Sequence, residues 1–179
     1  MSLDGPTPHS LRALIELTRS VADDVRAGQH RVVFDRDHRW SVRLHQDEYT
    51  DVWLISWTPR QSTELHDHAG SLGALTVVGG TVTERYWAKD AEGRPGLAER
   101  ALRTGRAAGF PVGHVHDVLN IRTESAITVH AYSPPLTAMG YYEIDDTPAL
   151  RRVRTVLTDD PEPDVPTLSR PPYATGVQP

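Results

Sequence analysis

The sequence predicts an all-β protein, a small β-barrel or β-sandwich, preceded by one α-helix and followed by a proline-rich tail. Short runs rich in β-branched and aromatic residues begin near residue 31 and recur about every eight to twelve residues. Asp, Gly, Pro and Asn separate these runs, which argues against a parallel α/β sheet. The length of 179 residues suits one domain with a substantial core.

The helix is expected at residues 9–27, where apolar side chains recur at helical spacing. Gly28 supplies a stop signal at its end. We expect this amphipathic helix to pack on the body of the domain. Its periodic apolar residues are Leu11, Leu14, Ile15, Leu17, Val21 and Val25.

The barrel is expected over about residues 31–157, within a single domain of residues 1–158. Gly79 and Gly80 indicate a tight hairpin turn. Residues 159–179 contain six prolines and little apolar material, so we expect an extended tail. The candidate strands are residues 31–34, 40–44, 52–57, 72–78, 81–86, 98–102, 107–110, 115–121, 126–132, 141–144 and 151–157.

The composition restricts the classes of function. The net charge is −5 and no cluster of Lys or Arg offsets it, so nucleic acid is not an expected partner. No apolar run approaches the roughly 18 residues that span a bilayer, and the first residues lack a signal-peptide pattern. We therefore expect a cytoplasmic protein. Cysteine is absent, which excludes disulfides, thiolate metal sites and cysteine nucleophiles, so imidazole and oxygen must hold any metal.

A His-x-His pair and a later histidine form the most informative pattern of the chain. His66 and His68 are two residues apart, and on a strand such residues project from the same face. Alone, this pair is weak evidence for metal binding, because histidines two residues apart are common on solvated strands. A turn at Pro111 and Gly113 leads into a second arm that ends in His116. Together the two arms predict three imidazoles that converge on one metal ion.

These residues resemble the two motifs of the cupin superfamily, G-x5-H-x-H-x3,4-E-x6-G and G-x5-P-x-G-x2-H-x3-N. The second motif matches at every defined position from Gly105 to Asn120, and Asn120 is expected to tie the adjacent loop. The first motif departs twice, because Arg60 replaces its leading Gly and Gly73 replaces its Glu. The resemblance implies a jelly-roll-like cupin barrel, in which that Glu is normally a fourth protein ligand.

Loss of the Glu at Gly73 changes the expected chemistry. Three neutral imidazoles leave the double charge of a divalent ion uncompensated and several coordination positions open. Such a site favours an anionic donor, of which a thiolate is a strong example. Redox-active iron with open positions can then bind substrate sulfur and dioxygen side by side, although imidazole ligands alone equally admit zinc, nickel or copper.

Within this superfamily the chain resembles the cysteine dioxygenases, specifically their bacterial branch, over residues 40–135. The resemblance rests on His66-Asp67-His68, on Ser71-Leu72-Gly73 and on Thr128-Val129-His130-Ala131-Tyr132-Ser133-Pro134-Pro135. It implies that Fe(2+) is the cofactor. The implied iron ligands are His66, His68 and His116.

The resemblance also implies a catalytic relay of Thr128, His130 and Tyr132, with Thr in place of the usual Ser. These residues alternate along one strand, so all three face the same side. His130 can link the two hydroxyls and fix the phenol near the metal, where it orients oxygen or hydrogen-bonds substrate. The alternative is a buried tyrosine–histidine pair that satisfies itself in the core.

Arg43 matches an arginine with which family members bind the carboxylate of cysteine, and a guanidinium fork suits that group. The family's tyrosine two residues earlier is Ser41, which removes one contact to the carboxylate. The alternative is that Arg43 lies on an exposed face. Mammalian members crosslink a cysteine to the relay tyrosine, and Gly73 occupies the position of that cysteine, so no crosslink forms here.

His114 precedes His116 by two residues and competes with it for the third ligand position. The spacing of the second motif favours His116, so His114 is expected to line the pocket or its rim. Trp53 and Trp57 are expected in the core or in the pocket wall.

The resemblance implies an Fe(2+)-dependent enzyme that oxidises L-cysteine with O2 to cysteine sulfinic acid. Three alternatives stay open. The first is a dioxygenase for another small thiol such as 3-mercaptopropionate. The second is a non-catalytic cupin that binds a metal or senses a ligand. The third is a metal-dependent isomerase, which the missing Glu disfavours.

Overall fold

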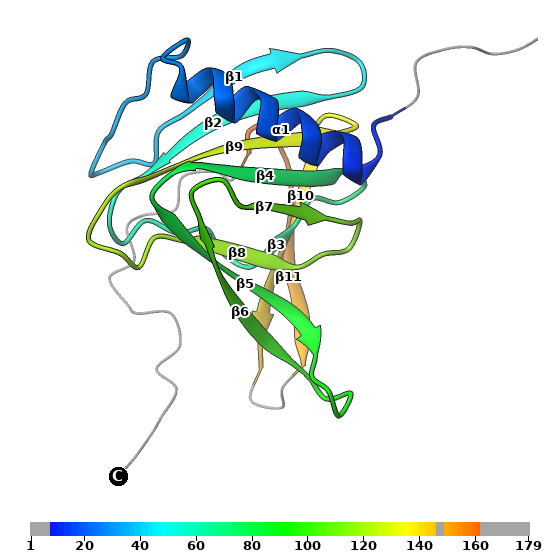
Figure 1. Ribbon diagram of the computed structural model, residues 1–179. Coiled ribbons are helices and arrows are strands. Elements are labelled where there is room, and N and C mark those ends of the chain that lie inside the picture. Colours follow the sequence, from blue (N-terminus) through cyan, green and yellow to red (C-terminus); the bar gives the residue numbers. More distant parts are fainter. Residues whose placement is uncertain (1–7, 146–148, 162–179) are drawn as a thin grey trace, which may run out of the picture.

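The computed structural model describes residues 8–145 and 149–161, which form two antiparallel β-sheets with one helix outside (Figure 1). The prediction of an all-β barrel with an N-terminal helix is therefore confirmed. From residue 162 onward, the expected tail lies outside the described residues. The first sheet contains, in spatial order, β1 (Ser41–Gln46), β2 (Asp51–Trp57), β9 (Ala126–Ser133), β4 (Leu72–Gly79) and β7 (Ala107–Phe110). The second sheet contains β11 (Leu150–Leu157), β10 (Ala138–Ile144), β3 (His66–Asp67), β8 (His116–Leu119), β5 (Thr81–Lys89) and β6 (Pro95–Arg103).

The helix α1 (Leu11–Arg26) forms where the apolar periodicity predicts it. The Oγ of Ser10 accepts a hydrogen bond of 3.2 Å from the backbone N–H of Ala13 and so caps the N-terminus. The helix lies across β4, β7 and β9 of the first sheet (Figure 1). Its buried residues are Leu14, Thr18, Ala22 and Val25. In the described part of the chain, no helix has both the length and the apolar content needed to cross a membrane.

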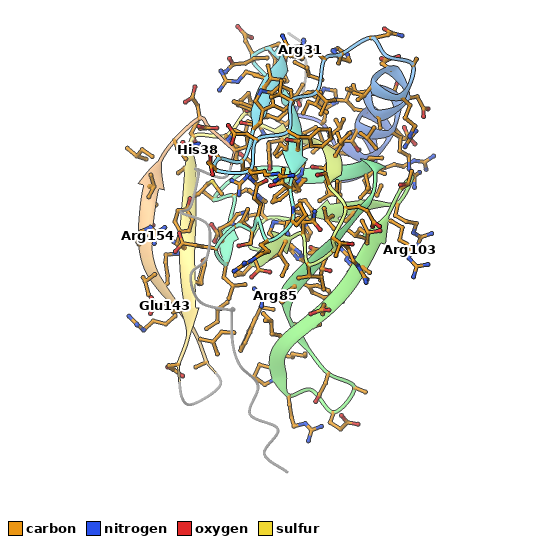
Figure 2. All side chains as sticks on the ribbon, turned by 90° about the vertical axis from the view of Figure 1, so that its left-hand side faces the viewer. Arg31, His38, Arg85, Arg103, Glu143 and Arg154 are labelled. Atoms are coloured by element: carbon orange, nitrogen blue, oxygen red, sulfur yellow. The ribbon has the colours of Figure 1, made fainter. Side chains whose placement is uncertain are left out.

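The strand β2 is buried along its whole length because the first sheet is covered on both faces. Val52 and Leu54 belong to the apolar cluster under the helix, whereas Trp53, Ile55 and Trp57 belong to the cluster between the two sheets. The two tryptophans therefore lie in the barrel interior, as expected. Charged residues such as Arg103 and Glu143 project from the periphery (Figure 2).

The predicted strand at residues 31–34 is wrong. This segment lies beside β2 without forming a ladder, and the carbonyl of Val33 accepts a hydrogen bond of 2.6 Å from the Oγ of Ser56. Val32 packs against the cluster under the helix. Val32 thus contributes to the core, whereas Phe34 is exposed, and β1 occupies the edge position next to β2.

The turn at Gly79 and Gly80 is present, but the prediction of a hairpin is wrong. β4 precedes the turn in the first sheet and β5 follows it in the second, so the two strands do not pair. Gly80 has a φ of 78°, and a Cβ there would lie 2.6 Å from the carbonyl oxygen of Ser125. Only glycine fits this passage between the two sheets.

Candidate metal centre

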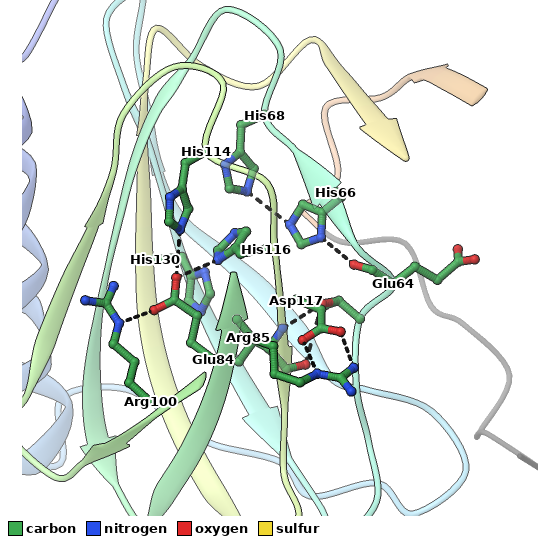
Figure 3. A network of polar contacts seen from close by, with 12 residues as sticks. Glu64, His66, His68, Glu84, Arg85, Arg100, His114, His116, Asp117 and His130 are labelled. Carbon is green, nitrogen blue, oxygen red and sulfur yellow. Dashed lines mark hydrogen bonds and ion pairs between the residues drawn. The ribbon is translucent and has the colours of Figure 1, made fainter. Parts of the chain in front are cut away.

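Pairing of β3 with β8 brings the two histidine arms together. His66 lies directly opposite His116 in this pairing, and His68 follows at the end of β3. One ring nitrogen from each of the three residues lies within 4.8 Å of the other two. All three side chains are buried, and Figure 3 shows that they point toward one another. We refer to His66, His68 and His116 as the histidine cage.

The geometry of the histidine cage fits a shared metal ion. The Nε2 atoms of His66 and His68 are 3.2 Å apart, and two nitrogens bound to one ion at tetrahedral or octahedral angles lie about 3.0 to 3.4 Å apart. The Nδ1–H of His66 donates to the carbonyl of Glu64 over 2.8 Å, so the lone pair on Nε2 points into the cage. In the described part of the chain the Nε2 of His116 is buried without a hydrogen-bond partner. A bound ion would satisfy this nitrogen.

The protonation state of the cage also suits metal ligation. Burial holds the pKa of His66 and His68 well below the usual value for histidine, and the neighbouring histidines add to this effect. Burial lowers the pKa of His116 as well, against the opposing influence of Glu84. All three imidazoles are therefore neutral near pH 7 and offer lone pairs, which is the form that binds metals.

A buried carboxylate stands directly behind the cage. Glu84 on β5 is fully buried, and its Oε1 lies 3.1 Å from the Nδ1 of His116 and 2.9 Å from the Nε2 of His114. Its Oε2 accepts a hydrogen bond of 2.5 Å from the Nε of Arg100 (Figure 3). Burial opposes ionisation, yet the hydrogen bonds from the two histidines and Arg100 hold the pKa of Glu84 well below its usual range. The surroundings of the cage thus contain an acidic group.

The sequence carried a signal for Glu84 that the motif comparison missed. Glu84 follows Val82 by two residues, and Val82 lies in the core between the sheets. On a strand these two residues share a face, so Glu84 also points inward. His114 does not enter the cage through its Nε2, because that atom contacts Glu84. Its predicted place beside the pocket agrees with this contact.

The three relay residues lie on β9 as a buried hydrogen-bonded chain. The Oγ1 of Thr128 is 2.9 Å from the Nε2 of His130, and the Nδ1 of His130 is 3.2 Å from the hydroxyl of Tyr132. The ring of Tyr132 lies 4.8 Å from the ring of His68, centroid to centroid. Burial, with smaller effects of His116 and of the positive charge of Arg39, lowers the pKa of His130 to about 3, so this imidazole is neutral.

Arg43 lies on the inner face of the first sheet, in one row with the relay. It pairs with Trp53 across β1 and β2, and Trp53 pairs with His130 across β2 and β9. The guanidinium carbon is 4.4 Å from the centroid of the Trp53 ring. Its NH2 donates to the carboxylate of Asp159 over 3.0 Å, and its NH1 donates to Gln46 over 2.8 Å. Its Nε is buried and has no hydrogen-bond partner among the described residues.

A family model described as cysteine dioxygenase type I matches residues 11–144. This range includes the helix, both histidine arms and the relay strand. The chain belongs to the cysteine dioxygenase type I family. Together with the histidine cage, this membership indicates a metal-dependent function of the cupin dioxygenase type.

Several solved structures are similar to this member of the family. The protein TT1209 from Thermus thermophilus is 23% identical, with a TM-score of 0.49 over 57% of this chain and 90% of that chain. BH2720 from Bacillus halodurans is 18% identical, with a TM-score of 0.49 over 74% and 85% of the two chains. A Klebsiella pneumoniae protein with a double-stranded β-helix domain is 17% identical, with a TM-score of 0.46 over 69% and 90%.

Gly73 allows the relay phenol of this dioxygenase-family chain to reach the cage. It pairs with Tyr132 on one side and with Phe110 on the other. A Cβ at residue 73 would lie 3.1 Å from the ring of Tyr132 and 3.0 Å from the ring of Phe110. A glutamate side chain does not fit here unless both rings move. The departure from the first cupin motif therefore makes room for an aromatic wall.

The second departure from that motif leaves a strained residue. Arg60 has a φ of 75°, in the left-handed region that favours glycine. Its backbone N–H donates to the carbonyl of Asn120 over 2.8 Å. The side-chain amide of Asn120 donates to the carbonyls of Trp57 and Glu124 over 2.9 and 2.8 Å, so it ties the adjacent loop as expected.

A second arginine near the cage was missed from the sequence. The guanidinium of Arg39 lies 5.0 Å from the centroid of the Trp57 ring and donates to the carbonyl of Ser62 over 3.0 Å. Burial is the main cause that lowers the pKa of His66 and His130, and the positive charge of Arg39 adds to it. Arg39 precedes β1, in a segment whose sequence gives no strand or motif signal.

Proposed function

We propose that this protein is an iron(II)-dependent thiol dioxygenase that oxidises L-cysteine with O2 to cysteine sulfinic acid, R–SH + O2 → R–SO2H. The observation that carries the proposal is a cage of three neutral imidazoles with a buried phenol beside it. Iron(II) held by His66, His68 and His116 would supply the redox chemistry that joins both oxygen atoms to the substrate sulfur. The match to the cysteine dioxygenase type I family supports this proposal.

The walls of the cage suit a small anionic sulfur ligand. The ring of Phe110 lies 4.2 Å from the ring of His116 and 5.9 Å from that of His68, centroid to centroid. These apolar contacts keep bulk water from the ring nitrogens and strengthen electrostatic attraction in the site. The three ligands carry no charge of their own, so a thiolate supplies one negative charge at the ion.

Tyr132 holds a proton at the edge of this site. Its oxygen lies 3.2 Å from the Nδ1 of His130, and we propose that this Nδ1 carries the hydrogen and donates to the phenol oxygen. The phenol O–H then points away from the relay. It would donate to the substrate or to oxygen at the centre, which orients the reacting group.

Arg43 binds the substrate carboxylate in this proposal. The Nε–H and one NH2 hydrogen of a guanidinium form a fork that matches two carboxylate oxygens. The buried Nε of Arg43 has no partner among the described residues, and its NH2 already accommodates the carboxylate of Asp159. A substrate carboxylate in the place of Asp159 would engage both groups.

The alternative substrate is 3-mercaptopropionate, which shares the thiol and the carboxylate of cysteine and lacks its amine. Ser41 on β1 pairs with Ile55 on β2, at the position where the family carries a tyrosine that contacts the carboxylate. Because both substrates have a carboxylate, this replacement does not favour one over the other, and the amine is what distinguishes them. The second alternative is a cupin that binds a metal and a thiol without catalysis.

The test is oxygen uptake by iron-loaded protein with L-cysteine, 3-mercaptopropionate and cysteamine, together with elemental analysis. We expect stoichiometric O2 consumption, a sulfinate product and the highest kcat/KM with L-cysteine. Equal kcat/KM for cysteine and 3-mercaptopropionate would show that the enzyme does not recognise the amine of cysteine. No O2 consumption with any thiol would favour the non-catalytic alternative.

A further inference from the structure

The contacts of Glu84 assign it a part in the metal centre. On β5 it pairs with Val118 of β8, and the next inward residue, Tyr86, pairs with His116. Glu84 therefore lies diagonally behind His116 and reaches the ring nitrogen that faces away from the cage. Across β6 it pairs with Arg100, which approaches its other oxygen.

We infer that Glu84 is a positioning residue of the metal centre: it fixes the ligating nitrogen of His116, excludes His114 from the ligand set and supplies negative charge to the ion through one imidazole. The inference rests on the metal-binding part of the proposed function. It does not depend on which thiol is the substrate.

The carboxylate of Glu84 fixes the tautomer of His116. An ionised carboxylate only accepts hydrogen bonds, so the Nδ1 of His116 must carry the hydrogen that points at Glu84 over 3.1 Å. The lone pair of this ring is then on Nε2, which is the buried atom without a partner among the described residues. A carboxylate behind a ligating histidine also raises the basicity of that ligand.

His114 lies beside His116, with 5.0 Å between the two ring centroids. Its Nε2 contacts the same oxygen of Glu84 over 2.9 Å. Its ring also stacks on those of Phe110 and Tyr86, at interplanar angles of 16° and 25°. These contacts hold His114 as a partner of Glu84, so the cage keeps three ligands.

Glu84 lies between a cation and the cage. Arg100 donates to Glu84 over 2.5 Å and lies 5.1 Å from the Tyr86 ring centroid, so a cation already faces the outer side of the carboxylate. This arrangement argues against a second metal ion among Glu84, His114 and His116, although these residues lie close enough for one. Glu84 thus compensates part of the charge of the ion in the cage without occupying a coordination position.

The experiment measures the dissociation constant of Co(II) by titration, and the Fe(III)/Fe(II) reduction potential, on protein without thiol. Glu84→Gln keeps the size of the side chain and removes its charge. We expect Co(II) affinity to fall about 10- to 100-fold and the potential to rise. Glu99→Gln, an exposed neighbour on β6, is the matched control and should change neither value.

Two further variants keep the inference testable if Glu84→Gln folds poorly. Arg100→Gln leaves both histidine contacts in place and removes the compensating cation, so we expect retained affinity and a lower potential. His114→Phe keeps an aromatic ring against Phe110 and Tyr86 and should leave the Co(II) affinity within about threefold, since the metal contact itself is retained.

The inference fails if Glu84→Gln binds Co(II) as tightly as the wild type, if the potential is the same in Arg100→Gln as in the wild type, or if His114→Phe loses affinity as strongly as His66→Ala. Because no thiol is present, these results are independent of oxygen uptake. An iron protein that oxidises no thiol would overturn the proposed function and leave the role of Glu84 intact.

Discussion

The indole Nε1–H of Trp57 donates a hydrogen bond of 2.8 Å to the Oγ1 of Thr128. An indole nitrogen is only a donor, so the Thr128 oxygen accepts from Trp57 and its own hydrogen stays available for another bond. In the proposed relay that hydrogen is donated to the Nε2 of His130. His130 is then protonated at Nδ1 and donates to the oxygen of Tyr132. Trp57 favours this direction of the relay, because a hydroxyl that accepts one hydrogen bond becomes a better donor of another.

Replacing Trp57 with Phe should weaken catalysis by removing this direction. Loss of one hydrogen bond in the network corresponds to about 1 to 1.5 kcal/mol, so we expect kcat to fall roughly tenfold. Oxygen uptake and iron content check this expectation, and iron content should not change. Thr128→Ser keeps the hydroxyl and should stay close to wild type. An active Trp57→Phe protein, with wild-type kcat, would show that the indole only fills space.

Replacing Tyr132 with Phe tests the role of the phenol. The ring keeps its packing against Gly73 and His68, and only the hydroxyl is lost. We expect kcat to fall about 100-fold, in line with the loss of a positioned proton donor, with unchanged iron content. If kcat is unaffected, the chain from Thr128 to Tyr132 is a self-satisfied core network.

Replacing Arg43 with Ala should raise the KM for L-cysteine. A hydrogen bond to a charged group contributes about 1.5 to 3 kcal/mol, which corresponds to a roughly 10- to 100-fold change. Iron content should be unchanged. Cysteamine lacks the carboxylate and serves as the control substrate, because its KM should respond little to the loss of Arg43.

Replacing Asp159 with Asn tests whether this carboxylate competes with substrate. Its Oδ2 lies 3.0 Å from the NH2 of Arg43 in the structure, and the side chain is largely exposed. Removal of its charge should lower the KM for L-cysteine about two- to threefold, a small effect typical of exposed ion pairs. A raised KM would instead mean that Asp159 holds Arg43 in its binding position.

His130 makes the stability of the protein depend on pH. Its pKa is about 3 in the folded protein, against an ordinary value of 6.5. Between these values the unfolded chain binds a proton that the folded protein does not, so stability falls as the pH falls below the ordinary value. From pH 7 to pH 5 this group should lower the free energy of unfolding by about 2 kcal/mol.

Urea unfolding at the two pH values, with EDTA present, measures this difference. His130→Asn should show a smaller loss of stability between pH 7 and pH 5 than the wild type, because the variant has no imidazole at residue 130. Equal pH dependence of the two proteins would assign the effect to other groups.

Local patterns predicted much of the fold and of the cage. The helix end at Gly28 and the alternation along β9 depend on neighbours in the sequence, and the structure agrees with both. The strand expected at residues 31–34 does not form, because Val32 packs under the helix without a strand partner and Phe34 is exposed. Its pattern carries no information about which strand takes the sheet edge.

The missed residues depend on contacts that are distant in sequence. The alternation with Val82 indicates that Glu84 points inward, but its contact with His116 arises only because β5 pairs with β8. Likewise, 116 positions separate Arg43 from Asp159, and no motif links them. Contacts of this kind between charged residues can be predicted only when the strand register of both sheets is known.

The strand β3 contains only His66 and Asp67, so the backbone ladder that sets His66 against His116 is very short. A slip of one residue would turn His66 out of the barrel and present Asp67 in its place. A metal ion bound by both His66 and His116 would hold the two strands in register, as additional backbone hydrogen bonds do in longer strands. Metal binding should therefore stabilise the pairing of β3 with β8 in the register that brings the three histidines together.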